Sequence, residues 1–70
     1  MDKFAKGDRV RIVKIVITEE DQYLDVKRMI AYIGKEGEVD QIDSSATPYY
    51  VLMDGRLDPY WWREEELERV

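Results

Sequence analysis

Apolar and polar residues alternate over short segments of the chain, and turn-forming residues separate these segments. After a turn at residues 6–8, Val10 and Ile12 alternate with arginines, and the phase shifts by one residue from Val13 onward. Alternation predicts β-strands, and a phase shift is typical of a β-bulge or a strong bend. The predicted strands cover about residues 8–17, 38–43, 49–53, 59–62 and 67–70. Short strands at such close spacing indicate a mainly β fold.

The segment between the first two predicted strands, residues 18–33, has a different period. Its apolar residues recur at intervals of three or four: Tyr23, Val26, Ile30 and Ile33. This spacing is typical of one face of a short helix. Thr18, with Asp21 three positions later, resembles a helix N-cap, and Gly34 ends the pattern. We expect a long, partly helical excursion, and an irregular loop with the same apolar anchors is the alternative.

Glycine, proline and short polar residues mark the other connections. Gly34 and Gly37 bracket a predicted tight turn, at which a Cβ atom would strain the backbone. The polar residues 43–48 read as a loop, and Asp54 followed by Gly55 marks a hairpin turn. Residues 63–65 are too few for an α-helix and predict a single 3₁₀ turn before the last strand.

The composition limits the chemistry of the protein. A chain of 70 residues is expected to form one domain, residues 1–70, without a deep enclosed cleft. It contains no cysteine and no histidine, which excludes disulfides, the usual zinc ligand sets and Ser-His or Cys-His nucleophiles. The aspartates from Asp40 onward lack the glycine and glutamate that an EF-hand loop needs. We expect no enzyme, no catalytic residue, no cofactor and no metal site.

The charge is distributed unevenly along the chain. Residues 1–35 carry eight basic and six acidic side chains, whereas residues 36–70 carry three basic and ten acidic ones, for a net charge of −5. This acidic balance disfavours a nucleic-acid partner, because the phosphate backbone repels it. The longest apolar stretch, residues 12–17, is too short to span a bilayer and no apolar signal segment opens the chain. We therefore expect a cytoplasmic protein with no membrane association.

Four stretches carry a resemblance to a known fold: KGDRVRI (6–12), YIGKEGEV (32–39), YVLMDG (50–55) and WREEELE (62–68). The chain resembles the SH3-like barrels, in particular small bacterial and phage barrels of uncharacterised function and, more distantly, the KOW-type barrels of ribosome and transcription factors. The resemblance implies a five-stranded SH3-like barrel with a long, partly helical first loop and a 3₁₀ turn before the last strand. It implies no proline-rich ligand, because the first loop lacks an Ala-Leu-Tyr-Asp-Tyr segment. These motifs are structural, so they indicate fold rather than activity.

Five aromatic residues lie close together on the third and fourth predicted strands: Tyr49, Tyr50, Tyr60, Trp61 and Trp62. Strand alternation forces the two tryptophans onto opposite faces. If the hairpin loop is residues 54–58, Val51 lies opposite Trp61 and both point into the core. If Asp54 and Gly55 alone form the turn, Tyr49 pairs with Tyr60 instead.

We expect the longer loop, with Trp61 inside the barrel and a recognition platform outside it formed by Tyr50, Tyr60 and Trp62. Such rings bind a partner chain or stacked bases. A structural explanation of the same rings is that the excursion, through Tyr23, Met29 and Ile30, folds over them and completes a second small core, and we expect Trp62 to be at least partly covered in this way.

Four basic residues form the candidate nucleic-acid surface: Arg9, Arg11, Lys14 and Lys35. In an SH3-like barrel the first and last strands are neighbours, so pairing of Arg9 and Arg11 with Glu66 and Glu68 explains these arginines without any ligand, and we favour this explanation. The acidic run from Glu64 to Glu66 is read as a solvated surface. The expected function is thus a small non-catalytic module with an unidentified protein partner, and the alternative is a nucleic-acid-associated barrel of KOW type.

Overall fold

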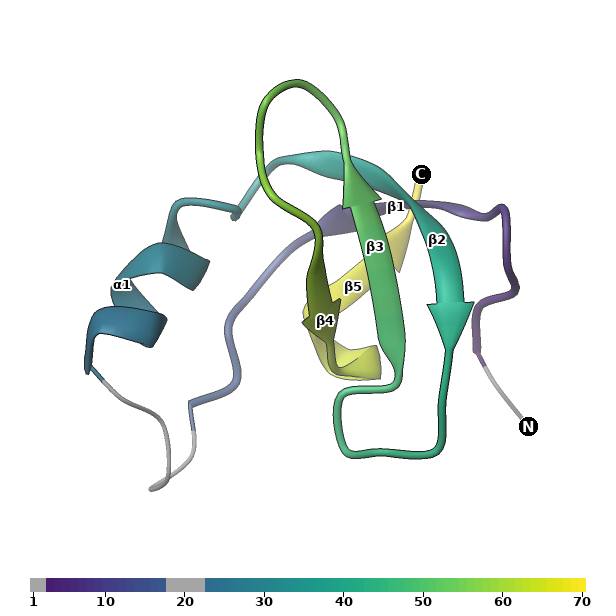
Figure 1. The fold of residues 1–70 in the computed structure, drawn as a ribbon, viewed down its shortest axis with the longest axis horizontal. Coiled ribbons are helices and arrows are strands. Elements are labelled where there is room, and N and C mark those ends of the chain that lie inside the picture. Colours follow the sequence, from purple (N-terminus) through teal and green to yellow (C-terminus); the bar gives the residue numbers. More distant parts are fainter. Residues whose placement is uncertain (1–2, 18–22) are drawn as a thin grey trace.

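The computed structural model describes residues 3–17 and 23–70. Within these ranges, five antiparallel strands form one curled sheet, a half-barrel, with a short helix at one side (Figure 1). The strands are β1 (Arg9–Ile12), β2 (Glu36–Ile42), β3 (Tyr49–Met53), β4 (Tyr60–Trp62) and β5 (Leu67–Arg69), in the order β4-β3-β2-β1-β5. Helix α1 (Tyr23–Ile30) precedes β2, and the 3₁₀ turn η1 (Glu64–Glu66) precedes β5. The predicted mainly β class, the five strands and the 3₁₀ turn are confirmed.

Strand alternation places one set of apolar side chains on the concave side of the sheet. In β3, Val51 and Met53 are buried while Leu52 between them is exposed. The buried apolar residues form one cluster: Phe4, Val10, Ile12, Met29, Tyr32, Val39, Tyr49, Val51, Met53, Trp62 and Leu67. Every strand contributes to this cluster, so the core lies inside the curl of the sheet.

The first strand is shorter than its hydrophobic pattern predicts. β1 ends at Ile12, and the backbone N–H of Val13 donates to the carbonyl oxygen of Glu66 at 2.9 Å instead of continuing the sheet. The predicted strand through Ile17 is therefore wrong, and the phase shift at Val13 marks the point where the chain leaves the sheet. A bulge occurs elsewhere, between Val39 and Gln41 of β2.

The excursion between β1 and β2 is partly helical, as predicted. The buried face differs from the predicted apolar face by one position, however: Met29 and Tyr32 are buried, whereas Ile30 and Ile33 are exposed. Gly34 ends the helical region with a φ of +88°, a conformation that favours glycine, and donates its N–H to the carbonyl oxygen of Ile12 at 2.8 Å. The predicted cap at residues 18–21 and the side chain of Tyr23 lie outside the described residues.

Gly37 has a different role from the one predicted. It lies within β2, opposite Val10 and Met53, and its φ is not in the left-handed region. A Cβ at this position would lie 2.5 Å from the carbonyl oxygen of Leu52 and 2.7 Å from Cγ1 of Val51. Glycine is needed here because two strands approach closely, and no turn is involved.

Candidate functional site

The β3–β4 hairpin sorts its five aromatic residues onto two faces. Tyr49 pairs with Trp62, Tyr50 with Trp61, and Val51 with Tyr60. Trp62 is completely buried, so the prediction that Trp61 is the inner ring and Trp62 the outer one is wrong. The observed register differs by one residue from the predicted one, in which Val51 lies opposite Trp61. A slip of one residue in the register turns every side chain of a strand to the opposite face.

The outer face of this hairpin carries Tyr50 and Trp61 side by side. Their ring centroids are 4.9 Å apart with an interplanar angle of 46°, and both rings are partly exposed. Leu52, two residues along β3 on the same face, is 40% exposed. We call these three residues the outer aromatic patch. Of the predicted platform only Tyr50 belongs to it, and Trp61 was missed because the loop length was misjudged.

The remaining two platform residues lie on the inner side. The rings of Tyr60 and Trp62 are 5.4 Å apart, and Tyr32 lies 6.0 Å from the first ring and 5.5 Å from the second. The Tyr32 hydroxyl donates to the backbone carbonyl of Asp58 at 3.0 Å, and burial raises the pKa of Tyr32. The excursion, through Met29 and Tyr32, therefore packs against the inner rings.

Tyr60 is partly exposed and lines an open hollow of about 550 Å³. Its lining comes from the end of the excursion and the start of β4: Arg28, Ala31, Tyr32, Asp58, Pro59 and Tyr60. The lining contains no serine, cysteine or histidine, so it offers no nucleophile activated by a neighbouring base. We see no catalytic arrangement in this hollow.

Carboxylates border the outer aromatic patch on the β2 side. Glu38 lies opposite Leu52 in the sheet register, Gln41 lies opposite Tyr50, and Asp40 occupies the bulge between them. Arg9 is the cross-strand neighbour of Glu38, but its guanidinium binds Asp54 and lies 4.0 Å from Glu36. Within residues 3–17 and 23–70, neither Glu38 nor Asp40 is part of an ion pair.

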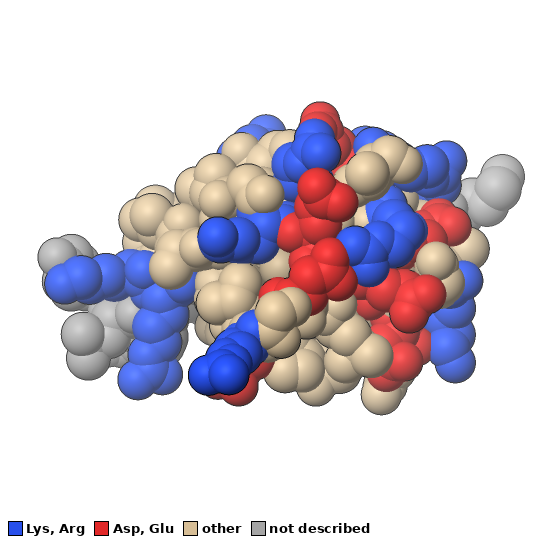
Figure 2. Space-filling view, turned by 90° about the horizontal axis from the view of Figure 1, so that it is seen from above, with Lys and Arg blue, Asp and Glu red and all other residues tan. Residues whose placement is uncertain are grey.

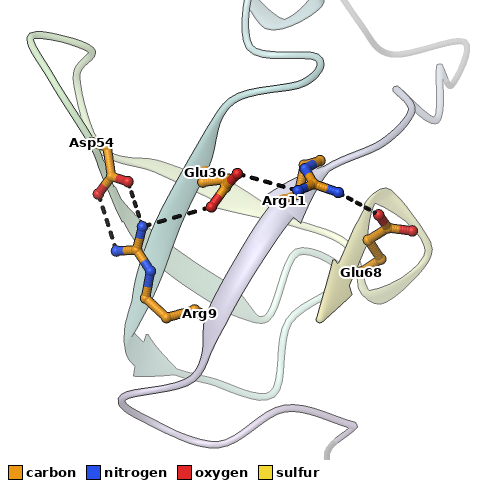
Figure 3. Close-up of polar contacts among 5 residues, drawn as sticks. All are labelled: Arg9, Arg11, Glu36, Asp54 and Glu68. Atoms are coloured by element: carbon orange, nitrogen blue, oxygen red, sulfur yellow. Dashed lines mark hydrogen bonds and ion pairs between the residues drawn. The ribbon is translucent and has the colours of Figure 1, made fainter. Parts of the chain in front are cut away.

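The two arginines of the candidate nucleic-acid surface are held in a ladder of alternating charges (Figure 3). Arg9 makes a two-pronged contact with Asp54, and Arg11 contacts Glu36 at 3.2 Å and Glu68 at 3.1 Å. Hydrogen bonds to Asp54 and Glu36 raise the pKa of Arg9 and Arg11, respectively. The bond from Arg9 lowers the pKa of Asp54.

The expected pairing with the last strand is confirmed for Arg11 and wrong for Arg9. Arg11 meets Glu68 as expected for neighbouring first and last strands, whereas Arg9 pairs with Asp54 rather than with Glu66. Lys14 and Lys35 are exposed, and neither enters an ion pair in the part of the chain that the structure describes. Figure 2 shows acidic side chains lying between the basic ones across the middle of one face.

Glu66 is buried, contrary to the solvated surface predicted for residues 64–66. Its carboxylate accepts the backbone N–H of Val16 at 2.9 Å and that of Arg63 at 2.8 Å. Glu64 and Glu65 are exposed, as expected. Glu66 thus ties the chain that leaves β1 to the turn that follows β4, which is a structural role.

Phe4 is a core residue that the sequence pattern did not predict. Its ring meets Tyr49 edge-on at a centroid distance of 5.3 Å, and the Tyr49 hydroxyl accepts the backbone N–H of Lys3 at 2.9 Å and of Phe4 at 3.3 Å. Lys3 and Arg69 lie over the Phe4 ring at 5.4 and 5.7 Å from its centroid. A lone aromatic between lysines near the start of the chain was the available signal.

Among residues 3–17 and 23–70, no three acidic side chains are grouped so that they could hold a metal ion. No helix in these ranges is both long enough and apolar enough to cross a bilayer.

No protein-family model matches the chain, and no curated protein matches its sequence.

Proposed function

We propose that this protein is a small, non-catalytic interaction module that binds a protein partner through the outer aromatic patch. The observation that carries the proposal is the pair of partly exposed rings, Tyr50 and Trp61, beside the exposed Leu52. Tyrosine and tryptophan combine a large apolar surface with a polar group, and they are enriched among the residues that dominate protein interfaces. The strand pairing and the contact between the two rings hold them on one face before a partner arrives, which reduces the entropy lost on binding.

The strand order supports an SH3-like barrel as the framework of this module. β1 lies between β2 and β5, a long excursion follows β1, and η1 directly precedes the last strand. Small cytoplasmic barrels of bacteria and phages that share this plan are the class to which we assign the protein. Function in such a fold resides in a local surface, which is why the patch carries the proposal.

A nucleic-acid-associated barrel of KOW type is the competing proposal. Its main candidate residues, Arg9 and Arg11, already donate to three carboxylates, so a phosphate would have to displace these partners. The net charge of −5 adds a general repulsion. These observations favour the protein partner.

A peptide library tests the proposal directly. Peptides selected from a random display library on the native protein are expected to lose affinity by about tenfold or more when Trp61→Ala or Tyr50→Ala is introduced. Ile33→Ala is the matched control, because Ile33 is an exposed apolar residue outside the patch. Selected peptides that bind all three variants equally would overturn the proposal. Binding of a single-stranded oligonucleotide that weakens steeply with salt would favour the KOW-type function.

A further inference from the structure

The sheet around the outer aromatic patch has a marked excess of negative charge. Residues 36–62, which contain β2, β3 and β4, carry six acidic side chains and one basic one. Only Glu36 and Asp54 among these acids enter ion pairs within the described ranges. The other four form no ion pair there, although the charge of Arg9 still acts on the first of them: Glu38, Asp40, Asp43 and Asp58. Two of these four, Glu38 and Asp40, lie at the β2 border of the patch.

Glu38 is the acid best placed to act together with the rings. It lies opposite Leu52, it is exposed, and its cross-strand neighbour Arg9 is bound to Asp54. Asp40 follows two residues along β2, toward the position opposite Tyr50. An approaching cation would thus meet two carboxylates at the β2 border of the patch and two aromatic rings at its centre.

The chain already uses the corresponding interaction elsewhere. Lys3 and Arg69 lie over the face of Phe4, where the negative potential of the ring attracts a cation. No cation of residues 3–17 and 23–70 lies over Tyr50 or Trp61 in the same way. These two rings and their acidic border form a surface that is complementary to a positive charge from another molecule.

We propose that the outer aromatic patch binds a basic segment of the partner protein, with a lysine or arginine side chain over the Tyr50–Trp61 pair and an apolar side chain against Leu52. This inference rests on the proposed function and specifies its partner. The negative border attracts the basic segment, and the rings give the contact its position. The same border repels nucleic-acid phosphates, so a basic protein segment is favoured over a nucleic acid.

A titration followed by NMR tests the proposal. The probe is a blocked peptide in which lysine alternates with leucine, and its counterpart carries glutamate in place of lysine. The basic peptide is expected to shift the indole N–H signal of Trp61 and the amide of Tyr50, whereas the acidic peptide leaves them unchanged. Trp61→Ala is expected to weaken binding by about tenfold, and Glu38→Gln by roughly threefold or more.

The matched control is Glu68→Gln, which removes the same charge from β5, the sheet edge farthest from β4. It is expected to change the dissociation constant by less than about twofold. If Glu38→Gln and Glu68→Gln weaken binding of the basic peptide equally, the peptide is attracted by the overall negative charge of the protein and not by the patch. That result would overturn the proposal. Failure of the basic peptide, while non-basic library peptides still need Trp61, would overturn this inference and leave the proposed function standing. If no peptide needs Trp61, both fail.

Discussion

Trp61 and Trp62 are neighbours in the sequence with the same side chain, yet they lie in opposite environments. Trp62 is completely buried among Tyr32, Tyr60 and the core, whereas Trp61 is partly exposed beside Tyr50. The register of a single hairpin makes the difference. In so small a sheet the inner face is needed for stability, and the outer face is available for a partner. Variants on the two faces should therefore separate stability from binding.

The largest expected effect comes from truncating the inner ring. Trp62→Ala should lower the free energy of unfolding by about 3–5 kcal/mol, because it leaves a large cavity in the core, and this loss approaches the whole stability of a small domain. Trp61→Ala should lower it by no more than about 1 kcal/mol. Urea denaturation monitored by circular dichroism measures both.

Trp62→Phe keeps an aromatic ring in the core and is the control for a variant that fails to fold. Its free energy of unfolding should lie between those of the wild type and Trp62→Ala. A larger loss for Trp61→Ala than for Trp62→Ala would mean that the hairpin has the other register.

The contrast also shows how far the sequence determines the fold. Apolar alternation located β3 at its observed bounds and found the other strands, because each is short and bordered by turn residues. Alternation alone does not say which of two adjacent aromatics is inside. That depends on the register across the hairpin, in which Val51 lies opposite Tyr60 and not, as predicted, opposite Trp61. Leu57, in the segment between β3 and β4, packs against the core.

Contacts between distant parts of the chain account for the remaining differences. Glu66 is buried because the amide of Val16, 50 positions away, supplies a donor for its carboxylate. Phe4 joins the core through Tyr49, 45 positions away. Local sequence patterns carry no record of such pairs, so the acidic run was predicted to be solvated and Phe4 was not predicted to lie in the core. The outer aromatic patch was found only in part for the same reason, because its composition depends on cross-strand register.

A second prediction concerns the space between β2 and β3. Gly37→Ala should lower the free energy of unfolding by about 1–3 kcal/mol. The new Cβ would lie 2.5 Å from the backbone oxygen of Leu52, and that atom cannot move freely. Leu52→Ala on the outer face should cost less, because Leu52 is 40% exposed. Thermal unfolding of both variants makes the comparison. A neutral Gly37→Ala would contradict the close approach of the strands.

A third prediction compares a buried carboxylate with an exposed one in η1. Glu66→Gln should destabilise the protein by about 1–3 kcal/mol, because one of the two backbone N–H groups, from Val16 or Arg63, then faces an amide NH₂ group instead of an oxygen. Glu65→Gln should change stability by about 0.5 kcal/mol or less, since Glu65 is exposed. Hydrogen exchange at Val16 gives a local measurement. Equal effects of the two substitutions would place Glu66 in solvent.

The smallest expected effect belongs to the exposed ladder and appears only in acid. The hydrogen bond from Arg9 lowers the pKa of Asp54 below its ordinary value of 3.8. As the pH falls, Asp54 is therefore protonated in the unfolded chain before it is protonated in the folded protein. Its contribution to stability is complete at pH values above its ordinary pKa of 3.8 and disappears as the pH falls through the lower pKa of the folded state.

Asp54→Asn should accordingly flatten the fall of the urea midpoint between about pH 5 and pH 2. Asp8, whose pKa is lowered by its hydrogen bond from the backbone of Ala5, is unchanged in this variant and leaves part of the acid dependence in place. Asp40→Asn is the control, since Asp40 has no ion pair among the described residues. Salt should reduce the difference between Asp54→Asn and the wild type, because the ladder is exposed to solvent. Identical acid profiles for Asp54→Asn and the wild type at low salt would show that Arg9 is not held by Asp54 in solution. The Arg9 guanidinium would then be available to an anionic partner.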